Sequence, residues 1–462
     1  LATFASIITL VATSPVLGQS NQELMDIIRE QQRQIEELSK KVDALMGQTE
    51  AATEKAEQAA ETAEQVEQDT NVVFKWGPAP TLQSEDGTWS FKVRGRLFVD
   101  GGYLGDDDGF FDDSNATELR AARLGVEGRI FKDFGYKFET DFADNDVDIK
   151  DAFIEYDGPV IEPVKFVRLG QFKTPNSLEE LTSSRYITFM ERAAITDAFD
   201  LDRRIGAGTA VGGENWGIEG GLFGQNVDVQ DRNEGFAVAG RGYYAFEDLV
   251  GEDTVLHLGT SARFRDLDNS ADDSEVRYRQ RPFFHFTGTR SVDTGSIENA
   301  DNDVFWGGEA ALVAGRFSAQ AEAANTWLQR SDGGDADSLW GAYGSVSYFL
   351  TDAKRNYSAG SGTFGRVSVD NPIHEGGMGA WEIAARYDYI SLNDGGAEIR
   401  GGKQGTTIVG VNWYLNNYVR MMLDGAWTRV FDANPRDTSG NAAVDGSQND
   451  IFGVGARAQV DF

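Results

Sequence analysis

The last thirteen residues of the chain alternate strictly between apolar side chains and polar or small ones. The apolar set is Phe452, Val454, Ala456, Ala458, Val460 and Phe462, and the other set is Gly453, Gly455, Arg457, Gln459 and Asp461. Such a strand has one face for an apolar environment and one for water. In a soluble sandwich the apolar face packs on a second sheet, whereas in an outer-membrane barrel it faces lipid. An aromatic last residue beside a polar face favours the closing strand of a barrel, and the sandwich is the alternative.

Three segments upstream repeat this alternation. Their apolar positions are Trp381, Ile383, Ala385, Tyr387 and Tyr389, then Val409, Val411, Trp413 and Leu415, then Val419, Met421, Leu423 and Trp427. Asn416-Asn417 predicts a two-residue hairpin turn with positive φ angles. The polar stretches 392–404 and 432–449 predict long loops. Short turns that alternate with long loops are typical of the periplasmic and extracellular ends of a barrel.

Composition agrees with an all-β transmembrane protein. The chain has 53 Gly, 29 Phe, 14 Tyr, 9 Trp and no Cys. After residue 18, no apolar run approaches the ~18 residues that a spanning helix needs. A chain without Cys also fits passage through an oxidising periplasm, although this observation carries little weight alone.

The N-terminal residues 1–18 resemble the apolar core and cleavage region of a secretory signal, with Val16 and Gly18 at the small-residue positions. The basic residues that normally precede such a core are missing and the chain opens on Leu, so we expect a clipped start. The mature protein is expected to begin near Gln19.

An unbroken heptad pattern covers residues 24–66. The a positions are Ile28, Ile35, Val42, Thr49, Ala56 and Ala63, and the d positions are Leu24, Gln31, Leu38, Leu45, Ala52, Ala59 and Val66. The pattern predicts a periplasmic coiled coil over 19–68, about 65 Å long in its heptad part at the α-helical rise. The pattern fits a coiled coil of two helices and one of three helices equally well. A lone amphipathic helix is the alternative, but it would leave the apolar stripe of a and d positions exposed to water. A polar linker, 69–87, then leads into a barrel over 88–462.

At the start of the barrel, Phe91, Val93, Leu97 and Val99 are expected to face lipid. Further on, four parts of the sequence carry a resemblance: 169–192 (LGQFKTPNSLEELTSSRYITFMER), Arg203-Arg-Ile-Gly-Ala-Gly208, 124–128 with 135–138, and 150–156. The block 169–192 is specific, and the others are generic for a barrel. These blocks resemble the phosphate-selective porin O and P family, and the similarity extends over essentially all of 88–462.

The resemblance implies a sixteen-stranded barrel, usually a homotrimer, whose third loop narrows the lumen. That loop would be 173–195, with 178–190 in part helical. Sixteen strands leave roughly 23 residues for each strand and its connection, enough for a spanning strand of ~9–11. The expected partners are outer-membrane lipid and lipopolysaccharide, small anions and, through the coiled coil, peptidoglycan or another periplasmic partner. No nucleic acid and no cofactor are expected.

Cationic side chains are the candidate pore residues, because guanidinium donates paired N–H groups that match phosphate oxygens. The candidates are the ladder Arg277, Arg279 and Arg281 on one side of a strand, the lumen row Lys92, Arg94 and Arg96, Arg120 and Arg123 ahead of the second strand, and Arg185, which rests on the resemblance. The alternative for each is a structural ion pair across the lumen. The available acids are Glu127, Glu139, Asp141, Asp151, Glu155, Glu179 and Glu180.

The net charge of −33 does not exclude an anion channel. Selectivity is set by the few groups at the narrowest point, whereas charges on outer loops are screened within ~8–10 Å. Within the acidic stretch 106–113, Asp106, Asp108 and Asp112 are a weak candidate for a Ca²⁺ site, and a solvated acidic loop is favoured over it.

Nothing in the sequence predicts catalysis. The three His, at 257, 285 and 374, are far apart along the chain, and no zinc motif or nucleophile elbow occurs. The glycines of 206–212 resemble a dinucleotide loop, but they fall on one face of an apparent strand and are interpreted as close-packing barrel glycines. The predicted function is a trimeric outer-membrane porin for small hydrophilic solutes that prefers anions, phosphate above all. The alternative is a general or cation-preferring porin whose stalk ties the outer membrane to the cell wall.

Overall fold

The computed structural model describes residues 29–30, 32–42, 46–47, 53–55, 57–58, 72–106, 113–159, 163–228, 235–249, 251–267, 275–331, 336–394, 399–432 and 448–462. The chain divides into two compact units, Leu1–Val72 and Val73–Phe462. In the described part of the chain, no helix has the length and apolar character that a membrane span requires.

In the first unit, residues 32–42 are helical. The heptad positions Ile35, Leu38 and Val42 on this helix are 65%, 61% and 52% exposed. The other a and d positions and the signal-like residues 1–18 lie outside the described residues, so the coiled coil and the signal peptide stay predictions.

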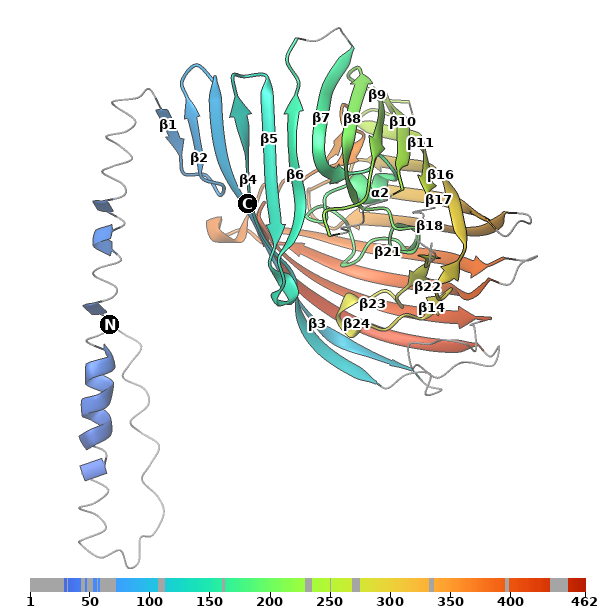
Figure 1. Ribbon diagram of the computed structural model, residues 1–462. Helices are drawn as coiled ribbons and strands as arrows, with labels where there is room; N and C mark the ends of the chain where they lie inside the picture. The colour runs from blue at the N-terminus through green and yellow to red at the C-terminus, as the bar shows by residue number, and fades with distance from the viewer. Residues whose placement is uncertain are drawn as a thin grey trace, which may run out of the picture. The chain divides into compact units, whose positions relative to one another are not determined.

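The second unit is a closed antiparallel barrel of sixteen strands (Figure 1). In order around the wall they are β3 (Trp89–Asp106), β4 (Ser114–Ile130), β5 (Phe134–Asp141), β6 (Asp148–Tyr156), β7 (Val164–Lys173), β8 (Arg203–Gly212), β9 (Trp216–Phe223), β10 (Ala237–Glu247), β11 (Thr254–Asp266), β16 (Ala300–Ala314), β17 (Phe317–Arg330), β18 (Asp337–Phe349), β21 (Ala380–Asn393), β22 (Arg400–Tyr414), β23 (Val419–Phe431) and β24 (Asn449–Asp461). Pairing of β24 with β3 closes the wall. The predicted all-β barrel with about sixteen strands is confirmed.

Strand β24 shows why the chain closes in this way. Its outward residues Phe452 and Val454 are 45% and 46% exposed, whereas Arg457 and Asp461 on the other face are each 2% exposed. Phe462 continues past the strand, and its Cε1 lies 2.7 Å from the place where a Cβ on Gly95 would be. The alternating sequence therefore separates lipid from lumen, as predicted, and the soluble sandwich is excluded by the closed wall.

The expected linker 69–87 contains two short strands, so its prediction as plain linker is wrong there. Strand β1 (Val72–Lys75) pairs with β2 (Thr81–Ser84), and β2 pairs with residues 90–92 of β3. The partner strand β24 pairs with β3 only from Arg96 onward. The first residues of β3 therefore extend beyond β24, and their backbone groups form hydrogen bonds with β2 instead.

Two predicted connections differ in detail. Neither Asn416 nor Asn417 has a positive φ. Instead, the Asn416 side-chain oxygen accepts hydrogen bonds from the backbone N–H groups of Tyr418 (2.8 Å) and Val419 (2.9 Å), so a side chain closes the turn. The loop predicted over 392–404 is also shorter, because β21 ends at Asn393 and β22 begins at Arg400, which leaves only 394–399 between the strands.

Three connections are long enough to carry structure of their own. The first, residues 174–202, holds α2 (Leu178–Leu181) and α3 (Ala194–Ala198), and we call it the third loop. The second, 267–299, holds β12 (Glu275–Val276), β13 (Arg279–Gln280), η2 (His285–Thr287), β14 (Val292–Asp293) and β15 (Ile297–Glu298). The last of these connections, 350–379, holds β19 (Tyr357–Ser358), β20 (Thr363–Phe364) and η3 (Ile373–Glu375). Apart from these, the one-turn helix η1 (Ala143–Asn145) lies between β5 and β6.

Candidate functional site

The third loop crosses the inside of the barrel and is fastened to one side of it. Arginines on β11, β21, β23 and β24 donate hydrogen bonds to its backbone oxygens: Arg263 to Phe199 (2.8 Å), Arg386 to Glu191 (3.0 Å), Arg420 to Ile187 (2.8 Å) and Arg457 to Met190 (2.5 Å). Glu322 on β17 accepts from the N–H groups of Leu178 (3.1 Å) and Glu179 (2.7 Å). These wall arginines are therefore structural, and the prediction that the third loop enters the lumen is correct.

Open space lies between the third loop, the wall strands β3–β9 and β24, and the 267–299 connection. It includes two cavities of about 280 and 240 Å³. Four residues line both of them: Arg123, Ser184, Arg192 and Arg203. The two cavities therefore meet at the third loop, and we call this junction the constriction.

Cations outnumber carboxylates around the constriction. Among the described residues that line the two cavities, twelve are Lys or Arg and seven are Asp or Glu. The cations are Arg96, Arg120, Arg123, Lys137, Lys150, Arg168, Lys173, Arg185, Arg192, Arg203, Arg281 and Arg457, and the acids are Asp151, Glu180, Glu191, Asp197, Asp200, Asp202 and Glu219. The lining is thus richer in cations than the chain as a whole, whose net charge is −33. Glu139, Asp141, Glu155 and Asp100 lie outside the described lining and pair with some of these cations.

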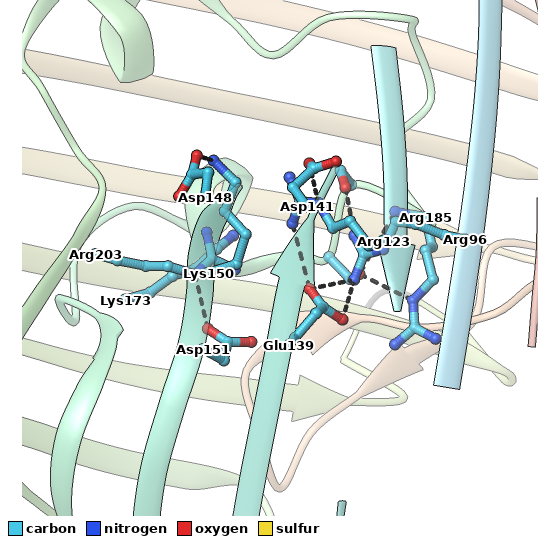
Figure 2. Close-up of polar contacts among 12 residues, drawn as sticks. Arg96, Arg123, Glu139, Asp141, Asp148, Lys150, Asp151, Lys173, Arg185 and Arg203 are labelled. Atoms are coloured by element: carbon cyan, nitrogen blue, oxygen red, sulfur yellow. Dashed lines mark hydrogen bonds and ion pairs between the residues drawn. The ribbon is translucent and has the colours of Figure 1, made fainter. Parts of the chain in front are cut away.

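Single carboxylates are shared between pairs of cations. Glu139 lies 3.0 Å from Arg96 and 3.3 Å from Arg123, and Glu180 lies 2.9 Å from Lys173 and 3.0 Å from Arg192. Asp151 pairs with Lys137 and with Arg203 (2.7 Å) in the same way. Figure 2 shows Glu139 with Arg96 and Arg123, and Asp151 beside Arg203. Arg123 also pairs with Asp141 (2.7 Å) and Arg203 with Asp202 (3.5 Å). One acid for two bases therefore holds for Glu180 with Lys173 and Arg192, and cationic N–H groups of this kind can donate to an anionic solute.

Glu191 on the third loop is shared by Arg120 and Arg457, each at 2.9 Å. Burial alone raises the pKa of a carboxyl, but the charges of Arg120 and Arg457 more than offset it and lower the pKa of Glu191 to about 2. Glu191 is therefore ionised over the whole physiological range, and it fixes the third loop to β4 and β24.

Arg185 differs from the other cations of the third loop. Its Ser183 neighbour accepts from Nε at 3.3 Å, and its guanidinium lies 5.1 Å from the centre of the Tyr186 ring. The Asp461 carboxylate is 3.9 Å away and also pairs with Arg366. Burial and the charge of Arg94 lower the pKa of Arg185. Burial is the larger of these two causes, and the Asp461 carboxylate offsets only part of it.

The comparisons with known proteins agree with this arrangement. A family model described as "Phosphate-selective porin O and P" matches residues 91–462. The chain belongs to this family. It is 34% identical over 413 residues to an uncharacterized protein of Caulobacter vibrioides (85% of this chain, 77% of that protein) and 28% identical to Porin O of Pseudomonas aeruginosa (76% and 85%). The fold is like that of an anion-selective porin from Comamonas acidovorans, with a TM-score of 0.52 at 13% identity, covering 81% of this chain and 100% of that one. The protein is an outer-membrane channel and not an enzyme.

The porin brings five of the predicted residues to the two cavities, Arg281 among them. Arg96 and Arg185 line the larger cavity, Arg120 lines the smaller one, and Arg123 lines both. Lys92 and Arg94 are absent from the described lining of both cavities and pair with Glu127, Lys92 at 3.5 Å. The alternative of a structural ion pair therefore describes Lys92 and Arg94 well, although Glu127 lies on the neighbouring strand β4 and not across the lumen.

The predicted ladder of Arg277, Arg279 and Arg281 is not part of a barrel strand. The three residues lie in the 267–299 connection, where β12 and β13 have only two residues each. Arg277 binds Asp293 through both carboxylate oxygens (2.7 and 2.5 Å), and Arg279 is exposed. Arg281 alone lines a cavity, 3.2 Å from Asp197. Alternation in a sequence identifies one face of an extended segment, but it does not say whether that segment joins the wall.

Arg120 and Arg123 lie within β4 and not ahead of it. A bulge separates the pairs Phe98–Ala121 and Val99–Leu119, so Arg120 has no direct partner on β3. A bulge adds one residue to a strand and shifts the alternation. Both arginines therefore reach the lumen, although a spacing of three would place them on opposite faces of a regular strand.

Sequence reasoning missed several cavity cations, above all Lys173, Arg192 and Arg203. Lys173 and Arg192 lie within the specific block 169–192, and Arg203 begins the family-like block 203–208, so the resemblance was the available signal. Lys137 and Arg168 on β5 and β7 could have been found from alternation with lipid-facing neighbours.

The candidate Ca²⁺ site is not tested by the structure, because Asp108 and Asp112 lie outside the described residues. Within the described ranges, no three His, Cys, Asp or Glu side chains are arranged to hold a metal ion. His257, fully buried on β11, instead pairs with Glu309 (2.9 Å) and Tyr357 (2.5 Å).

Proposed function

We propose that this porin is a passive channel that prefers small anions, inorganic phosphate among them. The observation that carries the proposal is the surplus of cations over carboxylates at the constriction. The family description and the name of the relative Porin O support it. A permeating ion a few ångströms from these groups interacts with them through partly dehydrated space, whereas loop carboxylates farther away than the ~8–10 Å screening length act weakly.

The geometry also accounts for passage without trapping. Guanidinium and ammonium groups replace part of the hydration shell of the anion, which lowers the barrier to entry. The same cations stay bound to Glu139, Asp151 and Glu180, so each has only part of its hydrogen-bonding capacity left for the solute. Binding is then weak enough for exit.

Replacing Arg185 with alanine tests the proposal cleanly, because Asp461 keeps its pair with Arg366 and no carboxylate is orphaned. In planar bilayers with a KCl gradient, we expect an anion-selective reversal potential in the wild type and a shift toward zero in Arg185→Ala. Phosphate should partly block the chloride current, and the variant should weaken that block about tenfold, in line with a charge-assisted hydrogen bond.

Arg316→Ala is the matched control. Arg316 is 43% exposed in the turn between β16 and β17, and its partner Asp352 is 90% exposed, so the substitution changes the net charge equally without touching the constriction. It should leave the reversal potential unchanged. The triple replacement of Arg277, Arg279 and Arg281 tests the ladder separately. A cation-selective wild type would establish the general-porin alternative in place of this proposal.

We also propose a homotrimer in which the N-terminal helices of three copies pair in the periplasm. The exposed seam of Ile35, Leu38 and Val42 supports it, because an unpaired helix leaves these side chains in water. Binding of the isolated 19–70 segment to peptidoglycan would test whether this stalk also tethers the outer membrane to the cell wall.

A further inference from the structure

Four phenylalanines line the larger cavity beside its cations: Phe153, Phe166, Phe172 and Phe223. They lie on β6, β7 and β9. The alternation of each strand places them on the lumen face, which they share with Asp151, Arg168 and Glu219. The lumen of a porin barrel is ordinarily polar, so a group of rings there is a departure that calls for a physical reason.

The wall behind two of the rings is made of glycine. A Cβ on Gly208 would lie 2.9 Å from the Phe172 ring, and a Cβ on Gly206 or Gly221 would lie 2.6 or 2.7 Å from the Phe223 ring. Any larger residue would push the rings away from the wall. Phe172 and Phe223 therefore lie directly against the wall and form an apolar floor, packed edge to face with centroids 5.4 Å apart.

The other two rings are only partly buried and flank a cation. The guanidinium of Arg168 lies 4.4 Å from the centre of the Phe153 ring and 4.4 Å from that of Phe166. Glu155 holds Arg168 in this position at 2.8 Å. Water and inorganic ions make no apolar contact with these two accessible rings, whereas an apolar part of a solute would.

Cations surround this apolar floor. Arg96, Lys173, Arg185 and Arg203 line the same cavity of about 280 Å³. A small-molecule site typically combines such an apolar surface with a few convergent polar groups. Here the cations suit a single anionic head, whereas Asp151, which also lines the cavity, pairs with Lys137 and Arg203, and Glu219 lies in the same lining.

We propose that the larger cavity selects organic anions, in which a phosphoryl or carboxylate head is attached to a flat apolar body. The head lies among Lys173, Arg185 and Arg203, and the body lies on the rings of Phe153 and Phe166. This inference rests on the proposed anion preference and names the class of solute that the same site favours. Inorganic phosphate uses the cations alone and gains nothing from the rings.

The test compares blockers of the chloride current in planar bilayers. Phenyl phosphate, glycerol phosphate and inorganic phosphate carry related heads on an aromatic body, a polar body and no body. Phenyl phosphate should half-block the wild-type channel at a concentration about tenfold lower than the other two, since burying one ring face contributes about that factor. In Phe153→Ala/Phe166→Ala, the ratio of half-blocking concentrations should fall to about one.

Phe138→Ala is the matched control, because Phe138 is 46% exposed on the lipid-facing side of β5. It makes the same chemical change on the other face of the wall and should keep the wild-type ratio. Equal block by phenyl phosphate and glycerol phosphate in the wild type, or an unchanged ratio in the double variant, would overturn the inference. The reversal potential is measured without any organic anion, so the failure of the proposed anion preference would be seen separately.

Discussion

Glycine residues on β8 and β9 decide how much room the lumen has beside the constriction. From the sequence, Gly206, Gly208 and Gly212 were predicted to be close-packing strand glycines and not a dinucleotide loop. That prediction is confirmed, because all three lie in β8 and a Cβ on any of them would approach a ring, a lysine chain or a backbone oxygen within 3 Å. The absence of a side chain at these positions is therefore a packing requirement of the site.

Gly206→Ala should destabilise the barrel by about 1–3 kcal/mol, the usual cost of overpacking a filled interior. The new methyl group would meet the Phe223 ring and the Leu222 backbone oxygen, which cannot both move. The measurement is the temperature at which the folded form disappears on a detergent gel. Gly344→Ala on β18 is the control, because nothing lies within 4 Å of its added Cβ. Equal melting temperatures for the two variants would contradict this account.

At the scale of elements, two connections from different parts of the chain meet inside the lumen. Arg355 of the 350–379 connection donates hydrogen bonds to Thr188 Oγ1 and to the backbone oxygen of Tyr186 (3.3 Å), both in the third loop. The Phe364 ring lies 3.8 Å from the Arg355 guanidinium. The 350–379 connection thereby supports the third loop, which sets the width of the constriction.

Arg355→Ala should loosen the third loop while leaving its lining charges in place. We expect a larger and noisier single-channel conductance with the sign of the ion selectivity retained. The readout is the distribution of single-channel conductances in planar bilayers. Arg129→Ala, which removes an ion pair with Asp157 at an exposed turn, should conduct like the wild type. An unchanged conductance distribution in Arg355→Ala would show that the third loop is held by the wall arginines alone.

For the whole molecule, closure of the wall is the main source of resistance to unfolding. Pairing of β24 with β3 leaves no open edge between the first and last barrel strands, and the strands of the wall pair with their neighbours apart from irregularities such as the bulge at Arg120. Detergent-extracted protein should therefore migrate differently on a dodecyl sulfate gel before and after boiling. Identical mobility, together with a helical circular dichroism spectrum, would be incompatible with this architecture.

Removal of residues 20–68 should leave a conducting pore, since the chain divides into separate compact units at Val72. The same deletion should lower the stability of the trimer, because it removes the paired helices that we propose. Conductance in bilayers and the proportion of trimer on an unheated gel measure the two effects. Loss of conductance in correctly inserted protein would show that the N-terminal unit is not a separate module.

The sequence by itself determined the barrel, because the alternation of apolar and polar residues is a local property of each strand. It also indicated the third loop and Arg185, through the family-like block 169–192. It could not determine which cations meet at the constriction. The bulge at Arg120 brings a second arginine to the lumen, and the 267–299 connection takes Arg277 and Arg279 away from the cavity lining. Those outcomes depend on strand register and on contacts between residues far apart in the chain, which only the tertiary structure decides.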